Sequence, residues 1–350
     1  MKLAVYTIAL NEAKHVKRWY EATKDADYHI IADTGSTDDT VKIAKELGIS
    51  VYEVSVTPFR FDDARNAALA LVPVDADICL SLDMDEVPEE GAIHTIKETW
   101  EEETTRGWLW WETGSKWKNN NRLHARHGYR WIKPCHEVTV KYTPGEEVYI
   151  DYDLSVYHKP DDTKSRSYYL PMLEMAVKED PRDTRMWHYY VRELFFHQKW
   201  EEVIFNAALG LKTEGGWKPE RAAMCRGAGH AASILNRKDE ALKWFAKGAD
   251  EAPDQLEAWF ALAQHCYEIG NWDGCWKASS KRLDFKKPET HYLVDKSIWD
   301  WRCYDLMSIS AYRTGKKKEA LKYAKMAIKA NPTDGRLQDN LKWLEENVAA

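Results

Sequence analysis

Short apolar runs alternate with amphipathic stretches over the first 85 residues of the chain. The apolar runs 3–9, 28–33, 49–56 and 78–82 predict buried strands, and residues 12–23, 36–47 and 62–71 have the spacing of amphipathic helices. Strand–helix alternation of this length predicts an α/β domain whose mostly parallel sheet carries helices on both faces. Ligands bind such sheets at the carboxyl ends of the strands, so the informative residues are expected just after each apolar run.

Residues 86–160 lose this alternation. Aromatic and β-branched runs at 108–111 and 137–140 predict strands added antiparallel to the sheet. Between them, residues 113–133 are basic and contain no Asp or Glu; their cations are Lys116, Lys118, Arg122, Arg126, Arg130 and Lys133. Trp117, Tyr129 and Trp131 are interleaved with these cations. The run either binds donor phosphates or an anionic acceptor, with the rings stacking on sugars or bases, or is a solvated loop above buried aromatic residues.

From about residue 180 the pattern is one helix after another, with an internal repeat. The equivalent positions Val203, Ala241, Cys275 and Ala320 lie 38, 34 and 45 residues apart. The pattern resembles the tetratricopeptide repeat (TPR), in which a small residue lets paired helices approach and a proline ends the second helix. An all-α solenoid of about four units is predicted, with an insertion near 285–295 that accounts for the longest spacing.

Composition narrows the class of protein. Hydrophobic residues make up 44% and charged residues 31%, which is typical of globular proteins rather than disordered or collagen-like ones. The net charge of −7 argues against a protein that coats nucleic acid, although a local basic patch remains compatible with it. No apolar run is long enough to span a membrane, and the six cysteines form no Cys-x-x-Cys pair. A soluble cytoplasmic protein with free thiols is expected.

Candidate chemistry begins with Asp83 and Asp85, which follow the strand at 78–82. Two neighbouring carboxylates repel each other, and a divalent cation relieves this repulsion. Hard oxygen ligands suit Mg²⁺ or Mn²⁺, which keep open positions for phosphate oxygens. The alternative is a solvated acidic loop.

Three further polar motifs lie beside predicted strands: Thr7 to Glu12, Asp33 to Thr40, and Arg65-Asn66. Asp33 ends a strand and is followed by a glycine-containing turn and a helix start, where it can accept a hydrogen bond from a nucleobase. Arg65 can hold a diphosphate or orient Asp83. Taken singly, each motif is also compatible with an ordinary capped loop or a helix-start carboxylate.

Taken in order, these motifs resemble those of glycosyltransferase family 2 enzymes of GT-A fold. The segments 121–123, 128–131 and 134–137 are similar to the branch of lipopolysaccharide-core and repeat-containing transferases. The resemblance implies a GT-A domain at 1–165 followed by a TPR-like domain at 166–350. It also implies site roles: a nucleotide pocket lined by Thr7, Glu12 and Asp33, a ribose or metal contact at Asp83, and a metal ligand at Asp85.

Two roles remain between rival residues. A histidine often completes the metal shell of GT-A enzymes; His158 is the candidate, His136 is its rival, and a structural histidine is the alternative. An inverting transferase needs a general base within hydrogen-bonding distance of the acceptor hydroxyl. Glu137 is the candidate for this base and Asp153 its rival, unless Glu137 is merely an edge-strand charge.

The resemblance therefore implies metal-dependent, inverting transfer of a hexosyl or pentosyl group. The donor is a nucleotide-diphosphate sugar and the acceptor is a hydroxyl of a glycan, a protein or another molecule. Two alternatives are the same chemistry on a hydroxymethylated base of viral DNA, and a non-catalytic TPR scaffold with a nucleotide-binding domain. The repeats are expected to bind protein or to mediate oligomerisation.

Overall fold

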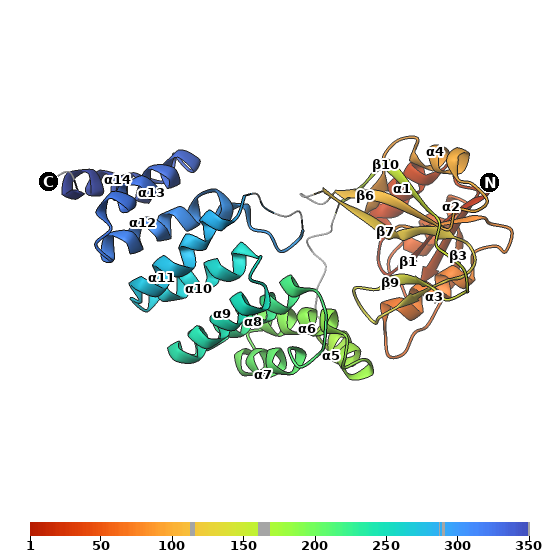
Figure 1. Ribbon diagram of the computed structural model, residues 1–350. Helices are drawn as coiled ribbons and strands as arrows, with labels where there is room; N and C mark the ends of the chain where they lie inside the picture. The colour runs from red at the N-terminus through yellow and green to blue at the C-terminus, as the bar shows by residue number, and fades with distance from the viewer. Residues whose placement is uncertain (113–115, 160–168, 287, 289–290, 349–350) are drawn as a thin grey trace. The chain divides into compact units, whose positions relative to one another are not determined.

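The computed structural model describes residues 1–112, 116–159, 169–286, 288 and 291–348 (Figure 1). It divides into two compact units, Met1–Met172 and Leu173–Ala350. The predicted domain boundary at 165/166 falls among residues 160–168, outside the described part of the chain, and therefore stays a prediction.

An eight-stranded sheet is the centre of the first unit within the described residues. Its order is β3-β2-β1-β4-β7-β6-β10-β5. The strands are β1 (Leu3–Ala9), β2 (Tyr28–Asp33), β3 (Ser50–Glu53), β4 (Ile78–Ser81), β5 (Glu86–Pro88), β6 (Arg106–Glu112), β7 (Lys116–Ala125) and β10 (Tyr149–His158). The first four strands in this order run parallel, as predicted. Strand β7 pairs antiparallel with both β4 and β6, whereas β10 runs parallel to β6 and antiparallel to β5.

Both faces of the sheet are covered, which explains why its strands are almost continuously apolar. Helices α1 (Ala13–Thr23), α2 (Thr40–Glu46) and α4 (Ala92–Thr99) pack on one face, where Leu3 and Val5 point. Helix α3 (Phe61–Ala70) packs on the opposite face with Ala4 and Tyr6. The predicted α/β fold of this part of the chain is confirmed.

One predicted pairing is wrong. The strand expected at 137–140 exists as β9 (Val138–Lys141), but it pairs with β8 (Tyr129–Ile132) in a separate two-stranded sheet. Since Trp131 of β8 packs into the core on the α3 side, this hairpin covers the large sheet instead of extending it. The described part of the basic run 113–133 is also mostly strand, in β7 and β8, rather than a solvated loop.

The described residues of the second unit are helical apart from their connections (Figure 1). Helical hairpins are formed by α6 (Thr184–Phe196) with α7 (Trp200–Gly210), α8 (Lys218–Ile234) with α9 (Lys238–Glu251), α10 (Leu256–Glu268) with α11 (Trp272–Ser279), and α12 (Cys303–Arg313) with α13 (Lys317–Ala330). Helix α5 (Tyr169–Glu179) precedes them and α14 (Gly335–Val348) follows. Each hairpin turns where the repeat pattern predicts, so the all-α solenoid is confirmed.

The same backbone geometry recurs at the turn of each hairpin. A residue of positive φ stands between the two helices: Gln198 (57°), Asn236 (61°), Gly270 (76°) and Gly315 (81°). Pro253 and Pro332 follow the ends of α9 and α13, as expected of residues that cannot continue a helix.

Two local features of the helical unit concern its packing and its longest connection. Helices α8 and α9 approach closely at Gly229, where an added Cβ would lie only 2.8 Å from the ring of Phe245. The insertion predicted near 285–295 lies between α11 and α12, flanked by a 3-10 helix at Ser280–Asp284 and a π-helical turn at Ile298–Arg302. No helix in the described ranges is long and apolar enough to cross a bilayer.

Candidate active site

The strand ends bring the candidate residues to one edge of the sheet. In the parallel register, Ala9 of β1 is opposite Asp33 of β2, and Tyr6 of β1 is opposite Ser81 of β4. Asp83 and Asp85 follow β4 at this edge, and Thr7 lies within β1. The carboxyl ends of β1, β2 and β4 therefore present their polar residues together, as the alternation of strands and helices predicts.

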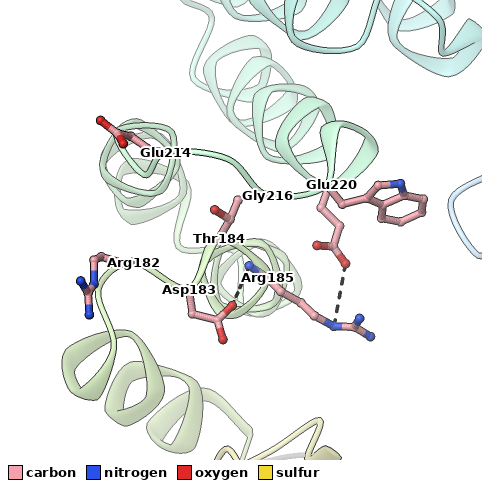
Figure 2. Close-up of a pocket in the computed structure, with 8 residues that line it drawn as sticks. Arg182, Asp183, Thr184, Arg185, Glu214, Gly216 and Glu220 are labelled. Atoms are coloured by element: carbon pink, nitrogen blue, oxygen red, sulfur yellow. Dashed lines mark hydrogen bonds and ion pairs between the residues drawn. The ribbon is translucent and has the colours of Figure 1, made fainter. Parts of the chain in front are cut away.

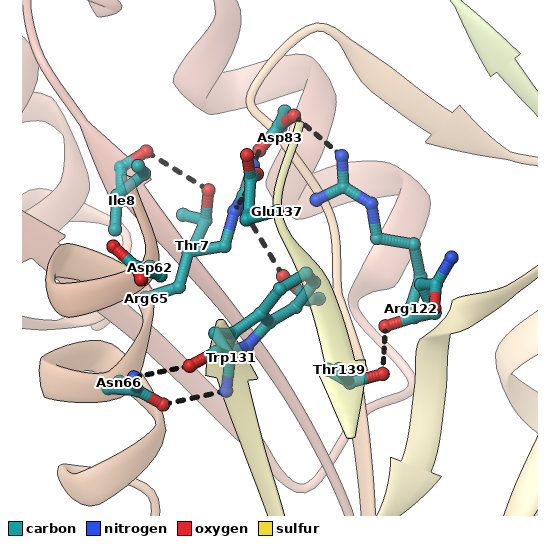
Figure 3. A network of polar contacts seen from close by, with 12 residues as sticks. Thr7, Ile8, Asp62, Arg65, Asn66, Asp83, Arg122, Trp131, Glu137 and Thr139 are labelled. Carbon is teal, nitrogen blue, oxygen red and sulfur yellow. Dashed lines mark hydrogen bonds and ion pairs between the residues drawn. The ribbon is translucent and has the colours of Figure 1, made fainter. Parts of the chain in front are cut away.

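Arg65 of α3 links two of these carboxylates (Figure 3). Its Nη2 donates to Oδ1 of Asp83 at 2.7 Å, and its Nε donates to Oε1 of Glu137 at 2.6 Å. The arginine is buried, and burial alone would lower its pKa. The charges of Asp83 and Glu137 outweigh this effect, so the pKa of Arg65 is raised. Arg65 is thus a fixed cation that sets the positions of both carboxylates.

A second arginine holds the other oxygen of Asp83. Nη2 of Arg122, on β7, donates to Oδ2 of Asp83 at 3.1 Å and lies 3.6 Å from Oε1 of Glu86. Burial raises the pKa of Asp83, but Arg122 and Arg65 outweigh it and hold that pKa well below its usual range. The charge of Asp83 is therefore neutralised by two guanidinium groups. Repulsion between Asp83 and Asp85, from which the sequence predicted a metal ion, is thus already relieved at Asp83. Arg65, Arg122, Asp83 and Glu137 are called the arginine cluster below.

Trp131 lies beneath both arginines. The guanidinium carbons of Arg65 and Arg122 lie 5.1 and 5.6 Å from the ring centroid of Trp131, whose exposed fraction is 2%. Asn66 donates to the carbonyl of Trp131 at 2.9 Å and accepts from its backbone N–H at 2.8 Å, which explains the Arg-Asn pair in the sequence. The expectation that this ring stacks on a ligand is wrong, because the ring is buried; Tyr129 is buried as well.

Asp85 and His158 form a separate pair. Oδ2 of Asp85 lies 3.2 Å from Nε2 of His158, and the backbone N–H of Lys159 donates to the carbonyl of Asp85 at 2.8 Å. The hydrogen bond to Asp85 raises the pKa of His158 in spite of partial burial. Strand β10 brings the histidine to this position by pairing His158 with Glu86 of β5. His136, the rival, lies beside the ring of Tyr169 instead.

An oxygen and a nitrogen ligand thus lie next to each other at the strand ends. A carboxylate and an imidazole suit Mn²⁺ or Mg²⁺ as part of a shell that phosphate oxygens complete. Across the described ranges, no group of three or more His, Cys, Asp or Glu side chains is arranged to hold a metal ion. The two side chains that could contribute to such a shell at this place are those of Asp85 and His158.

One carboxylate oxygen of Asp33 has no hydrogen-bond partner among the described residues. Its Oδ2 accepts from the backbone N–H groups of Gly35 (3.1 Å) and Ser36 (2.9 Å), while Oδ1 is buried and makes no hydrogen bond within the described part of the chain. A buried carboxylate oxygen costs free energy unless a donor reaches it. Thr7 and Glu12 are also buried; the hydroxyl of Thr7 donates to the carbonyl of Ile8, and the backbone N–H of Glu12 donates to Thr40.

The two candidate bases lie in different surroundings. Glu137 belongs to the arginine cluster through Arg65. Asp153 is exposed on β10, where it accepts a hydrogen bond from Nε1 of Trp110 at 3.0 Å. The structure therefore brings Glu137, and not Asp153, next to Asp83. Sequence patterns mark Arg122 as a member of the basic run and of segment 121–123 but assign it no contact with Asp83, since no local signal shows that β7 pairs beside β4.

A partly parallel α/β sheet with acidic residues at the ends of β2 and β4 is the architecture of the GT-A class of glycosyltransferases. Residues 4–163 match the family described as Glycosyl transferase family 2. The first unit therefore carries a glycosyltransferase family 2 domain, and TPR-like repeats follow it in the chain.

Solved structures similar to the chain include several TPR proteins. They include YrrB, "a TPR protein with an unusual peptide-binding site", at 12% identity over 50% of this chain and 82% of that one, with a TM-score of 0.41. MamA has 15% identity over 47% of this chain and 86% of that one, with a TM-score of 0.37. A tetratricopeptide repeat protein from Parabacteroides merdae has 14% identity over 50% of this chain and 63% of that one, with a TM-score of 0.37. No curated protein matches the chain.

Proposed function

We propose that the first unit is a metal-dependent, inverting glycosyltransferase that uses a nucleotide-diphosphate sugar as donor. One observation carries this proposal: the arginine cluster and the Asp85–His158 pair lie together at the carboxyl end of β4. This arrangement offers a fixed carboxylate for the nucleoside, a ligand pair for a cation and a second carboxylate for proton transfer.

The donor's nucleoside would bind along the ends of β1 and β2. The unoccupied Oδ1 of Asp33 can accept a hydrogen bond from a nucleobase N–H, and Thr7 and Glu12 line the same edge. Asp83 would accept from a ribose hydroxyl. Since both of its oxygens are already held by arginines, its position is fixed before the donor arrives. Arg65 then acts by orienting Asp83 rather than by binding the diphosphate.

Asp85 and His158 would hold the Mn²⁺ or Mg²⁺ ion. When bound, the ion would neutralise charge that builds up on the diphosphate as it leaves. The residues fit this role because, within the described part of the chain, Asp85 contacts the imidazole of His158, whereas Asp83 is held by two arginines.

Glu137 would act as the general base. The acceptor hydroxyl gives its proton to the Glu137 carboxylate, and its oxygen lone pair forms a bond to the anomeric carbon. The bond from that carbon to the diphosphate oxygen breaks, and the electron pair leaves with the diphosphate. Attack from the face opposite the leaving group inverts the anomeric carbon. Arg65 positions Glu137 through the 2.6 Å hydrogen bond.

Variants of Asp85 test the metal site directly. We expect Asp85→Ala to abolish sugar transfer and to remove the Mn²⁺-dependent rise in melting temperature that nucleoside diphosphates give the wild type. Asp25→Ala, an exposed change in the same unit, is the matched control and should behave as the wild type. Full turnover by Asp85→Ala in the presence of EDTA would refute the metal role.

The variant Glu137→Gln tests the general base. It should bind the donor normally and transfer the sugar slowly, and a wild-type rate would show that another residue is the base.

Two further features complete the proposal. All six cysteines are buried free thiols, which supports a reducing compartment such as the cytoplasm.

The stacked hairpins of the second unit offer an extended surface, which supports binding of a protein partner or a second copy of the chain. Deleting residues 173–350 should then impair acceptor use more than donor hydrolysis, and unchanged acceptor kinetics would contradict this.

A further inference from the structure

Strand β6 presents two kinds of side chain on its two faces. Leu109 and Trp111 are buried in the core on the side of α1, α2 and α4. Trp108 and Trp110 alternate with them and are only partly buried on the opposite face. Large aromatic rings that the core does not require, yet which stay on one face of a sheet, indicate a surface with a role in binding.

Strand β10 continues this face. Tyr152 and Val156 pack in the core, whereas Asp151 and Asp153 are exposed on the side of Trp110, to which Asp153 is hydrogen-bonded. The β8–β9 hairpin covers only the near part of the face, where the carbonyl of Thr139 accepts from Arg106. We call the exposed part, formed by Trp108, Trp110, Lys116, Lys118, Tyr149, Asp151 and Asp153, the β6 platform.

The aromatic rings of the platform are held in place. The rings of Trp108 and Tyr149 are 6.3 Å apart and inclined by 32°, so that they form a shallow strip, and 46% of Tyr149 is exposed. Nε1 of Trp110 donates to Asp153, which fixes the plane of the indole. A pyranose ring has an apolar C–H face that packs on such rings, and its hydroxyl groups at the rim can donate to carboxylates like those of Asp151 and Asp153.

The lysines of the platform are already neutralised. Nζ of Lys116 lies 2.9 Å from Oε1 of Glu112, and Lys118 forms an ion pair with Asp151. Both ammonium groups also lie over the ring of Trp110, at 5.1 and 4.7 Å from its centroid. The described part of the basic run therefore presents little net charge here, which disfavours a phosphorylated glycan or DNA and favours an uncharged ligand.

Two strands carry residues of both the platform and the candidate active site. Strand β7 carries Lys118 on the platform and Arg122 in the arginine cluster, and β10 carries Asp153 on the platform and His158 beside Asp85. A molecule on the platform therefore lies along the strand that carries Arg122 of the arginine cluster. We propose that the β6 platform binds the acceptor and that this acceptor is an uncharged carbohydrate, an inference that rests on the proposed function.

Substitution of Trp110 tests the platform by binding, without any donor. Wild-type protein and Trp110→Ala are applied to an array of uncharged oligosaccharides together with their phosphorylated and sulfated counterparts. We expect the wild type to bind uncharged members and Trp110→Ala to bind them about tenfold more weakly or not at all. Trp117→Ala is the matched control, because Trp117 lies on the same strand as Lys118, is 40% exposed and points to the other face.

If Trp110→Ala does not fold, Asp153→Asn keeps the ring and should weaken the same binding. Binding of charged members alone, binding of no member, or equal loss in Trp117→Ala would overturn the inference. Nucleoside-diphosphate binding by Trp110→Ala should equal that of the wild type, which separates the platform from the donor site. Loss of oligosaccharide binding in Trp110→Ala, with no nucleotide-sugar bound by the wild type, would refute the transferase and leave the carbohydrate surface standing.

Discussion

Nη2 of Arg65 lies 2.7 Å from Oδ1 of Asp83, and this contact joins helix α3 to the end of β4 across 18 residues of sequence. It makes Asp83 a structural residue as well as a candidate ligand residue. The two aspartates of the Asp-x-Asp motif thus differ in kind, because Asp83 neutralises buried arginines and Asp85 contacts a histidine.

This difference predicts stability effects of different size. Asp83→Asn leaves Arg65 and Arg122, whose side chains are 4% and 15% exposed, without one of their anionic partners. Since Asp83 itself is 33% exposed, the cost should exceed about 1 kcal/mol but stay below the roughly 3–5 kcal/mol of a fully buried pair. Asp85→Asn loses a partly exposed pair and should change the free energy of unfolding by less than about 1 kcal/mol. Urea titrations of both variants measure the contrast. Equal effects would show that the arginines do not depend on Asp83.

Loss of the buried hydroxyl of Tyr6 should lower the free energy of unfolding by more than the removal of one oxygen atom suggests. It accepts from Nε1 of Trp131 at 2.8 Å and lies 3.0 Å from Nε2 of His124. Since Nδ1 of His124 faces the carbonyl of Ala125 and must donate to it, Nε2 accepts from the tyrosine. Tyr6→Phe leaves both partners unsatisfied and should cost about 1–3 kcal/mol for each. Tyr52→Phe, at an exposed site, is the control, and equal melting temperatures would contradict the prediction.

His124 should also make the first unit sensitive to acid. Burial lowers its pKa from 6.5 to about 4. Between these values the unfolded chain binds a proton that folded His124 does not, so the free energy of unfolding falls as pH falls from 6.5 to 4. The loss is on the order of 3 kcal/mol. His124→Gln should flatten the stability profile over this window, whereas the exposed change His94→Gln should not. An unchanged slope in His124→Gln would assign the acid sensitivity to other groups.

A single substitution in the turn of the first helical hairpin is predicted to stabilise the second unit. Gln198 has φ of 57°, a conformation that costs a side chain about 1–2 kcal/mol and glycine almost nothing. Gln198→Gly should stabilise the second unit by about 0.5–1 kcal/mol after the entropic cost of glycine is deducted. Gln198→Ala keeps the strain and should give no gain. Differential scanning calorimetry of the two variants decides, and a lower melting temperature for Gln198→Gly would contradict the strain argument.

The sequence predicted those features that depend on local patterns. Apolar runs located β1 to β4, and the hairpin turns followed from the repeat alignment, because each is set by residues near one another in the chain. The pairing of His158 with Asp85 was anticipated as a ligand pair, and the structure places the two side chains in contact, although whether they bind a metal stays a prediction.

Contacts between residues far apart in the chain could not be predicted from the sequence. Arg122 meets Asp83 only because β7 returns antiparallel beside β4, and a basic run gives no sign of which cation will face inward. Trp131 looked like a ligand-stacking ring for the same reason: its burial depends on the β8–β9 hairpin folding over α3, which strand propensity alone does not specify.

The alternation along β10 places core residues and exposed residues on the two faces of one strand. Positions 150, 152, 154 and 156 are packed in or against the core and are constrained by folding, while 151, 153 and 157 are exposed. Codon randomisation restricted to those three odd-numbered positions would sample new specificities in a scaffold that stays intact. Relatives descended from a common ancestor would be expected to diverge there first.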